Sequence, residues 1–210
     1  MTRAAGVVLA GGQASRMGKR NKALLKVGGL PLIERVVIAL APLVSRVIIV
    51  ANDPAPFRYL GLETIPDALG ASGALAGLLA GLLEARQPVL ATGCDLPFIS
   101  GPLAMYLMEN LPGWDAVVPK CPEGLQPLFA VYGPGCVEPV RKAVDLGERR
   151  ITGFYRGLSV RYVEGPELAP FEPDRAFFNI NTPADLALAR KMAESELLYS
   201  NSRAYNGEDG

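Results

Sequence analysis

Short apolar runs rich in β-branched residues recur along this chain, and segments with helical spacing of apolar residues separate them. The runs are residues 7–10, 47–51, 89–92 and 116–118. Continuous apolar runs of this length are typical of strands buried on both faces, as in a parallel sheet. The helical patterns are residues 30–43, 74–85 and 103–111. This alternation predicts βαβ units, and hence a single-domain, Rossmann-like α/β fold: a three-layer α/β/α sandwich with a mostly parallel sheet.

The carboxyl-terminal third continues the pattern less regularly. A strand-like run at residues 126–132 is followed by a Pro134-Gly135 break and a helix candidate at residues 136–144. Thr182 and Pro183 are typical of a capped helix start. Residues 199–210 are polar and rich in Asn, Ser and Gly, so we predict one domain over residues 1–198 and a disordered tail.

Composition excludes several classes of function. The 210 residues carry 21 basic and 21 acidic side chains, so no global positive field favours nucleic acid. No apolar stretch reaches the ~20 residues that cross a bilayer, and the three cysteines lack metal-site spacing, which favours a cytoplasmic protein. The chain has no histidine. Its chemistry must therefore rest on carboxylates, amides, lysine, arginine and a metal ion.

A glycine-rich turn with four cations behind it follows the first predicted strand, within residues 9–22. Gly11 and Gly12 allow backbone N–H groups to face an anion, and Arg16 and Lys22 supply positive charge. The segment fits neither the dinucleotide fingerprint nor the P-loop, because five residues separate Gly12 from Gly18 and Arg20 follows Lys19. It predicts a polyphosphate cradle; the alternative is a glycine turn with a solvated basic face.

Short polar residues follow the next two predicted strands. Asn52 directly follows the run at 47–51, and Asp95 comes shortly after the run at 89–92. Ligands of open α/β sheets collect at the carboxyl ends of the strands. We therefore predict that Asp95 binds Mg²⁺, which would offset the charge that develops when pyrophosphate leaves. The alternatives are a capping role for Asp95 and a plain turn at Asn52.

Two amides alternate ahead of the last helix, at Asn179 and Asn181, so both side chains are expected on one face. Asn181 or Thr182 also suits a helix cap, but a cap does not need the second amide. Arg149 and Arg150 form a small basic patch, for which a solvated helix face is the simpler interpretation and a phosphate or pterin contact the alternative.

Four motifs, in order, resemble those of the MobA-type molybdenum cofactor guanylyltransferases, over about residues 6–190. They are LAGGQASRMGKRNK from Leu9, CDLPF from Cys94, QPLFAVY from Gln126 and FNINTPADL from Phe178. Two positions depart from the family pattern: Asn21 stands where Asp is usual, and Ala74 where Pro is usual. The broader relatives are sugar-nucleotide and cytidylyl transferases, which implies a nucleotide-diphospho-sugar transferase-like fold.

The resemblance implies roles for individual residues. Leu9, Ala10, Gly11 and Lys22 would hold the nucleotide. Asn52 would contact guanine or another part of the nucleotide, and Asp67 would accept hydrogen bonds from guanine. Asp95 would bind Mg²⁺ with Asn181 as a second, neutral ligand, and Asn179 would lie near the acceptor.

The reaction implied is attack by the phosphate of molybdopterin on the α-phosphorus of GTP, which transfers GMP and releases pyrophosphate. Alternatives are a CTP-dependent molybdopterin cytidylyltransferase, a sugar-1-phosphate nucleotidyltransferase, and a nucleotide-binding module without turnover. The expected partners are GTP and molybdopterin, without nucleic acid or membrane; transient contacts with molybdenum-insertion proteins or recipient molybdoenzymes fit the same picture.

Overall fold

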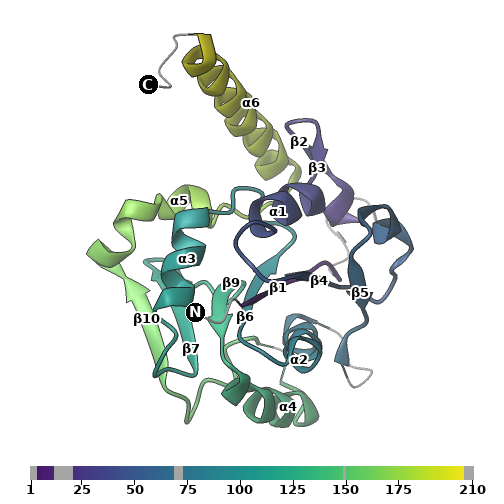
Figure 1. Ribbon diagram of the computed structural model, residues 1–210, viewed down its shortest axis with the longest axis vertical. Coiled ribbons are helices and arrows are strands. Elements are labelled where there is room, and N and C mark those ends of the chain that lie inside the picture. Colours follow the sequence, from purple (N-terminus) through teal and green to yellow (C-terminus); the bar gives the residue numbers. More distant parts are fainter. Residues whose placement is uncertain (1–3, 12–20, 69–72, 149, 206–210) are drawn as a thin grey trace.

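The predicted apolar runs form the centre of one twisted sheet in the computed structural model of the chain (Figure 1), which describes residues 4–11, 21–68, 73–148 and 150–205. In this part of the chain the main sheet has eight strands, in the order β10-β7-β9-β6-β1-β4-β5, and β8 pairs with β7. The strands are β1 Ala5–Leu9, β4 Val47–Val50, β5 Glu63–Ile65, β6 Val89–Gly93, β7 Ala116–Cys121, β8 Gly124–Leu125, β9 Phe129–Tyr132 and β10 Val160–Glu164.

The centre of the sheet is parallel. β1 pairs in parallel with both β4 and β6, and Leu9 lies opposite Val50 on one side and Gly93 on the other. β9 runs antiparallel to β6 and β7, while β10 is parallel to β7. The carboxyl ends of β1, β4 and β6 therefore meet at one edge, where the sequence placed its polar residues.

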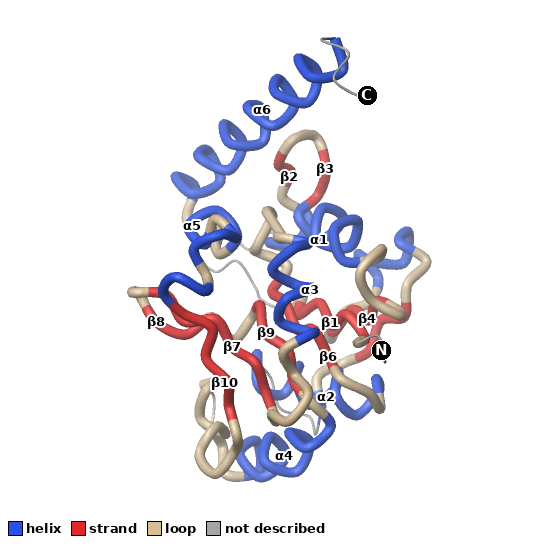
Figure 2. The backbone as a smooth tube through the Cα atoms, turned by 60° about the vertical axis from the view of Figure 1, so that its left-hand side comes forward, coloured by secondary structure: helices blue, strands red, loops and turns tan. Residues whose placement is uncertain are grey.

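Helices cover both faces of the sheet (Figure 2). They are α1 Leu32–Leu40, α2 Ala74–Ala85, α3 Gly101–Glu109, α4 Val137–Asp145, α5 Pro173–Ala176 and α6 Pro183–Tyr205. Alternate strand residues point to opposite faces: Val8 and Ile49 pack with residues of α1 and α3, whereas Val7 and Ile48 pack with residues of α2 and α4. The predicted three-layer, mostly parallel sandwich is confirmed.

A third apolar cluster joins the base of α6 to a small hairpin, β2 Lys26–Val27 with β3 Leu30–Pro31. Val27, Phe98 and Ile180 are buried together there, and Arg190 Nε donates to Lys26 O at 3.1 Å. Short 3₁₀ turns complete the described chain at η2 Lys22–Leu24, η3 Ala55–Leu60, η5 Pro134–Cys136, η6 Gly165–Glu167 and η7 Ala169–Phe171.

The last helix runs beyond residue 198. α6 continues through Tyr205 and extends away from the sheet (Figure 1), and disorder of the tail stays a prediction. Residues 184–205 contain neither glycine nor proline, so the helix has no backbone stop signal there. Residues 206–210 lie outside the described residues, and a domain boundary at residue 198 stays a prediction.

Two more elements differ in extent from the expectation. The helix predicted over residues 30–43 begins at Leu32, because Leu30 and Pro31 pair with the hairpin strand. The strand predicted from residue 126 begins at Phe129. Among the described helices, none combines the length and the apolar character that crossing a membrane requires.

Candidate nucleotide-binding site

A cavity of about 260 Å³ opens at the carboxyl ends of β1, β4 and β6. Six residues singled out from the sequence line it: Leu9, Gly11, Lys22, Asn52, Asp67 and Asp95. Gly77 of α2, Gly93 of β6 and Leu128 before β9 also line it, although none of them was an individual site candidate. The topology therefore brings together motifs that are far apart in the sequence.

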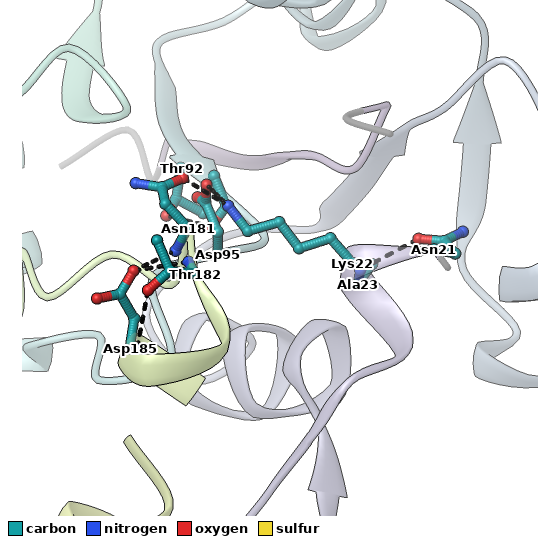
Figure 3. A network of polar contacts seen from close by, with 9 residues as sticks. Asn21, Lys22, Ala23, Thr92, Asp95, Asn181, Thr182 and Asp185 are labelled. Carbon is teal, nitrogen blue, oxygen red and sulfur yellow. Dashed lines mark hydrogen bonds and ion pairs between the residues drawn. The ribbon is translucent and has the colours of Figure 1, made fainter. Parts of the chain in front are cut away.

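Lys22 is the centre of a polar network at one end of the cavity (Figure 3). Its Nζ donates to Asp95 Oδ2 at 2.7 Å and to Asn181 Oδ1 at 3.0 Å. The side chains of Lys22 and Asp95 are only 13% and 19% exposed, so solvent screens this ion pair less than a surface pair. Asn21 Oδ1 accepts from Ala23 N at 3.1 Å, which caps the turn that carries Lys22.

The end of β6 positions Asp95. Cys94 N donates to Leu9 O at 3.1 Å, which ties the residue before Asp95 to the end of β1. A Cβ on Gly93 would lie 2.4 Å from Asp95 Oδ1, so any larger residue there would displace the carboxylate. Cys94 itself is buried, and burial together with the neighbouring Asp95 charge raises its pKa to about 12, so the thiol stays protonated at neutral pH.

The segment with the two asparagines lies directly beside Asp95. Ile180 N donates to Asp95 O at 3.1 Å, and the Ile180 side chain is buried in the cluster under α6. Asn179 and Asn181 on either side of it are exposed. The structure thus brings Asn181 to Lys22 and Asp95, while the acceptor contact of Asn179 stays a prediction.

Asp185 is a residue that the sequence reasoning missed. Its Oδ2 accepts from Asn181 N at 2.8 Å and from Thr182 N at 2.7 Å, and Thr182 Oγ1 accepts from Asp185 N at 3.1 Å. The Thr-x-x-Asp spacing is the signature of a capping box and was available as a signal. The box fixes the backbone of Asn181, and therefore the amide oxygen that faces Lys22.

We expect Asp185→Asn to lower the melting temperature at pH 7. Hydrogen bonds from Asn181 N, then from Thr182 N, lower the pKa of Asp185 below its ordinary 3.8, so the ionised carboxylate stabilises the fold above that pH. The advantage over the variant should shrink as pH falls below 3.8 and Asp185 becomes protonated. Thermal unfolding followed by circular dichroism at several pH values measures this; a difference that is independent of pH would contradict it.

Asn52 and Asp67 form a reciprocal pair at the other end of the cavity. Asn52 Nδ2 donates to Asp67 Oδ2 at 3.0 Å, and Asp67 N donates to Asn52 Oδ1 at 2.9 Å. A Cβ on Gly77 would lie 3.2 Å from Asp67 Oδ1 and 3.0 Å from Leu9 Cδ2. A glycine at this position therefore keeps space beside the Asp67 carboxylate.

The remaining sequence candidates have different outcomes. Gly12, Arg16 and Arg149 lie outside the described residues. Ala10 is buried, and its N–H donates to Val50 O at 2.9 Å, so it joins β1 to β4. Arg150 is exposed, and its backbone N–H donates to Glu148 Oε1 at 2.8 Å. Direct ligand contacts for these residues stay predictions.

Comparison with known proteins gives one consistent result. The profile described as "MobA-like NTP transferase domain" matches residues 6–162. A "Probable molybdenum cofactor guanylyltransferase" of Pelotomaculum thermopropionicum is 41% identical over 197 residues, covering 93% of this chain and 96% of that protein. The "Molybdenum cofactor guanylyltransferase" of Desulfosudis oleivorans is 33% identical, covering 88% and 93%.

A solved structure agrees with these sequence matches. The "Molybdopterin-guanine dinucleotide biosynthesis protein A" of Archaeoglobus fulgidus superposes with a TM-score of 0.79 at 29% identity, covering 91% of this chain and 99% of that one.

Proposed function

The chain belongs to the MobA-like NTP transferase family, and we propose that Lys22, Asp95 and Asn181 form the centre where it transfers a guanylyl group. It is a nucleotidyltransferase that uses GTP and acts in molybdenum cofactor biosynthesis. The observation that carries the proposed centre is the position of the Lys22 ammonium, 2.7 Å from Asp95 Oδ2 and 3.0 Å from Asn181 Oδ1 at the cavity.

The reaction needs charge stabilisation more than proton transfer. We infer that the phosphate of molybdopterin attacks the α-phosphorus of GTP and that pyrophosphate leaves. A phosphate nucleophile is already ionised at neutral pH, which agrees with a chain that has no histidine. Positioning of the two anions and neutralisation of the triphosphate are then the main catalytic terms. Lys22 supplies positive charge at the cavity. Arg16 of the first loop is proposed to add to this charge, and the backbone N–H of Gly12 is proposed to donate to phosphate oxygens.

The donor atoms around Lys22 fit Mg²⁺. Asp95 and Asn181 each direct a side-chain oxygen at the Lys22 ammonium in this structure. Hard oxygen atoms of this kind are the ligands that Mg²⁺ prefers. The described residues contain no group of three or more His, Cys, Asp or Glu that could hold a metal. The proposal therefore assigns the other ligands of the ion to waters and substrate phosphates. When bound, Mg²⁺ would neutralise charge on the phosphate oxygens.

The Asn52 and Asp67 end of the cavity is proposed to hold the base. The Asp67 carboxylate can accept from the guanine ring N–H and the exocyclic amino group, whereas cytosine lacks the ring N–H donor. Leu9 and Gly77, which both line the cavity, would flank the base. Asn179, near the other end, is proposed to contact the acceptor; cytoplasmic location and contacts with molybdenum-insertion proteins or recipient molybdoenzymes belong to the same proposal.

Titration calorimetry tests the nucleotide assignment. Protein freed of nucleotide would be titrated with GTP, CTP, ATP and UTP in the presence of Mg²⁺, and selective binding of GTP is expected. A preference for CTP would instead assign the base pocket to cytosine.

Asp67→Asn tests base recognition directly. The variant should bind GTP about 10-fold to 100-fold more weakly, because it replaces a charged acceptor of hydrogen bonds with an amide. Inosine triphosphate, which lacks the exocyclic amino group, is the matched probe: the unchanged protein should prefer GTP over it, and the variant should lose that preference. Equal discrimination by both proteins would exclude Asp67 from contact with the base.

A further inference from the structure

The segment Gln126 to Leu128 borders the cavity but lies outside the strand pairing of β9, which begins at Phe129. Hydrogen bonds hold it at three successive residues. Gln126 N donates to Pro119 O at 2.8 Å, and Leu128 O accepts from Gly93 N at 3.1 Å. Pro127 has no N–H, and its carbonyl accepts from a side chain instead.

That side chain belongs to Tyr132, which is fully buried at the end of β9. Its hydroxyl donates to Pro127 O at 2.8 Å and lies 2.8 Å from the hydroxyl of Tyr155. A carbonyl only accepts, so the single Tyr132 proton is committed to Pro127 and Tyr155 must donate to Tyr132. Burial is the main cause of the raised pKa of both phenols, so both stay protonated as donors at neutral pH.

We propose that Tyr132 and Tyr155 are positioning residues for guanylyl transfer, acting through Pro127 and Leu128 on the strand end that carries Asp95. The inference rests on the proposed function. Leu128 lines the cavity, and its carbonyl is bonded to Gly93, two residues before Asp95. This hydrogen bond between Gly93 N and Leu128 O lies at the Asp95 end of the cavity and not at the end formed by Asn52 and Asp67.

The position of the hydrogen bond between Leu128 and Gly93 at the Asp95 end of the cavity predicts which kinetic constant changes. Loss of the Tyr132 hydroxyl leaves Pro127 O without its donor, and the segment that supports Gly93 can then shift. A shift of the reacting groups lowers the rate of transfer, whereas binding of the base is proposed to depend on Asn52 after β4 and Asp67 after β5. A purely structural role would instead lower stability without this separation of effects.

The test compares three tyrosine-to-phenylalanine variants with the unchanged protein. Tyr132→Phe should lower kcat by about tenfold, in line with loss of one positioning hydrogen bond, and leave the Kd of GTP unchanged. Tyr155→Phe keeps the bond from Tyr132 to Pro127 and should have a smaller effect in the same direction. Tyr106→Phe is the matched control, because the Tyr106 hydroxyl bonds to Glu167 and neither residue lines the cavity.

A readout that needs no turnover separates this inference from the assigned reaction. Hydrogen exchange at the Gly93 amide, which donates to Leu128 O, should be about tenfold faster in Tyr132→Phe than in Tyr106→Phe. Equal exchange in the two variants would overturn the inference, even if the unchanged protein showed no transfer. So would a Tyr132→Phe protein that loses stability but keeps its kcat, or one that loses GTP affinity in proportion to kcat.

Discussion

Replacing Asp95 with asparagine is expected to lower kcat by about 10³-fold or more, the scale typical of removing a central electrostatic group. The amide keeps the size of the side chain and an oxygen that can accept from Lys22 Nζ. It removes the negative charge that the proposed Mg²⁺ site requires. Asn181 would then be left as the only proposed protein ligand, and a neutral amide binds Mg²⁺ weakly.

The fold should survive this change, because Asp95 contributes its backbone carbonyl to Ile180 N whatever the side chain is. Melting temperature close to that of the unchanged protein is the first check. Asp53→Asn is the matched control: Asp53 also follows a central strand, but it is exposed and its Oδ1 accepts from Ala55 N at 3.0 Å. The control should keep its activity. Substantial turnover by Asp95→Asn would remove Asp95 from the metal site.

Mg²⁺ dependence separates two explanations of a loss in Asp95→Asn. If Asp95 holds the ion, raising the Mg²⁺ concentration should recover part of the activity, because mass action offsets weaker binding. Asp53→Asn and the unchanged protein should be saturated at the lower concentration. If raising the Mg²⁺ concentration does not recover activity in Asp95→Asn, the loss would instead point to a role of Asp95 in orienting Lys22 alone.

The centre of the fold was predictable because it carries the strongest patterns. Strands β1, β4, β6 and β7 are nearly continuous apolar runs, and burial on both faces is what produces such runs. Edge strands carry no such signal. In β10 Val163 is the buried residue among exposed and half-buried neighbours, and β5 is short and partly exposed. Both were missed for this reason.

The site likewise combines residues that the sequence predicted with contacts that it did not. Lys22, Asp95 and Asn181 were predictable because strand ends, a glycine turn and an alternating pair of amides mark them in the sequence. That Lys22 Nζ contacts both oxygens depends on three separate segments and has no local signal. Tyr132 and Leu128 belong to the QPLFAVY motif, so the sequence marked their segment, but nothing in an apolar strand-like run indicates that the Tyr132 hydroxyl reaches back to Pro127 O.

Replacing Lys22 with methionine is expected to lower kcat/KM by about 10²-fold to 10³-fold. Methionine is close in length but carries no charge, so the triphosphate loses a cation at the cavity and Asp95 loses its partner at 2.7 Å. Both KM for GTP and kcat should change, because the charge is needed for ground-state binding as well as for transfer. Steady-state kinetics with GTP and the acceptor measure the two constants.

Two further variants make the Lys22 result specific. Lys26→Met removes an exposed lysine four residues along the same segment and should leave kcat/KM unchanged. Lys22→Arg keeps the charge but replaces a compact ammonium with a planar guanidinium, so it should recover only part of the activity. If Lys22→Met retained more than about half of the activity, the direct role of this ammonium would be excluded. Loss of even one hydrogen bond to a charged group lowers activity by more than a factor of about two. Full activity in Lys22→Arg would show that charge alone matters and that the geometry with Asp95 and Asn181 does not.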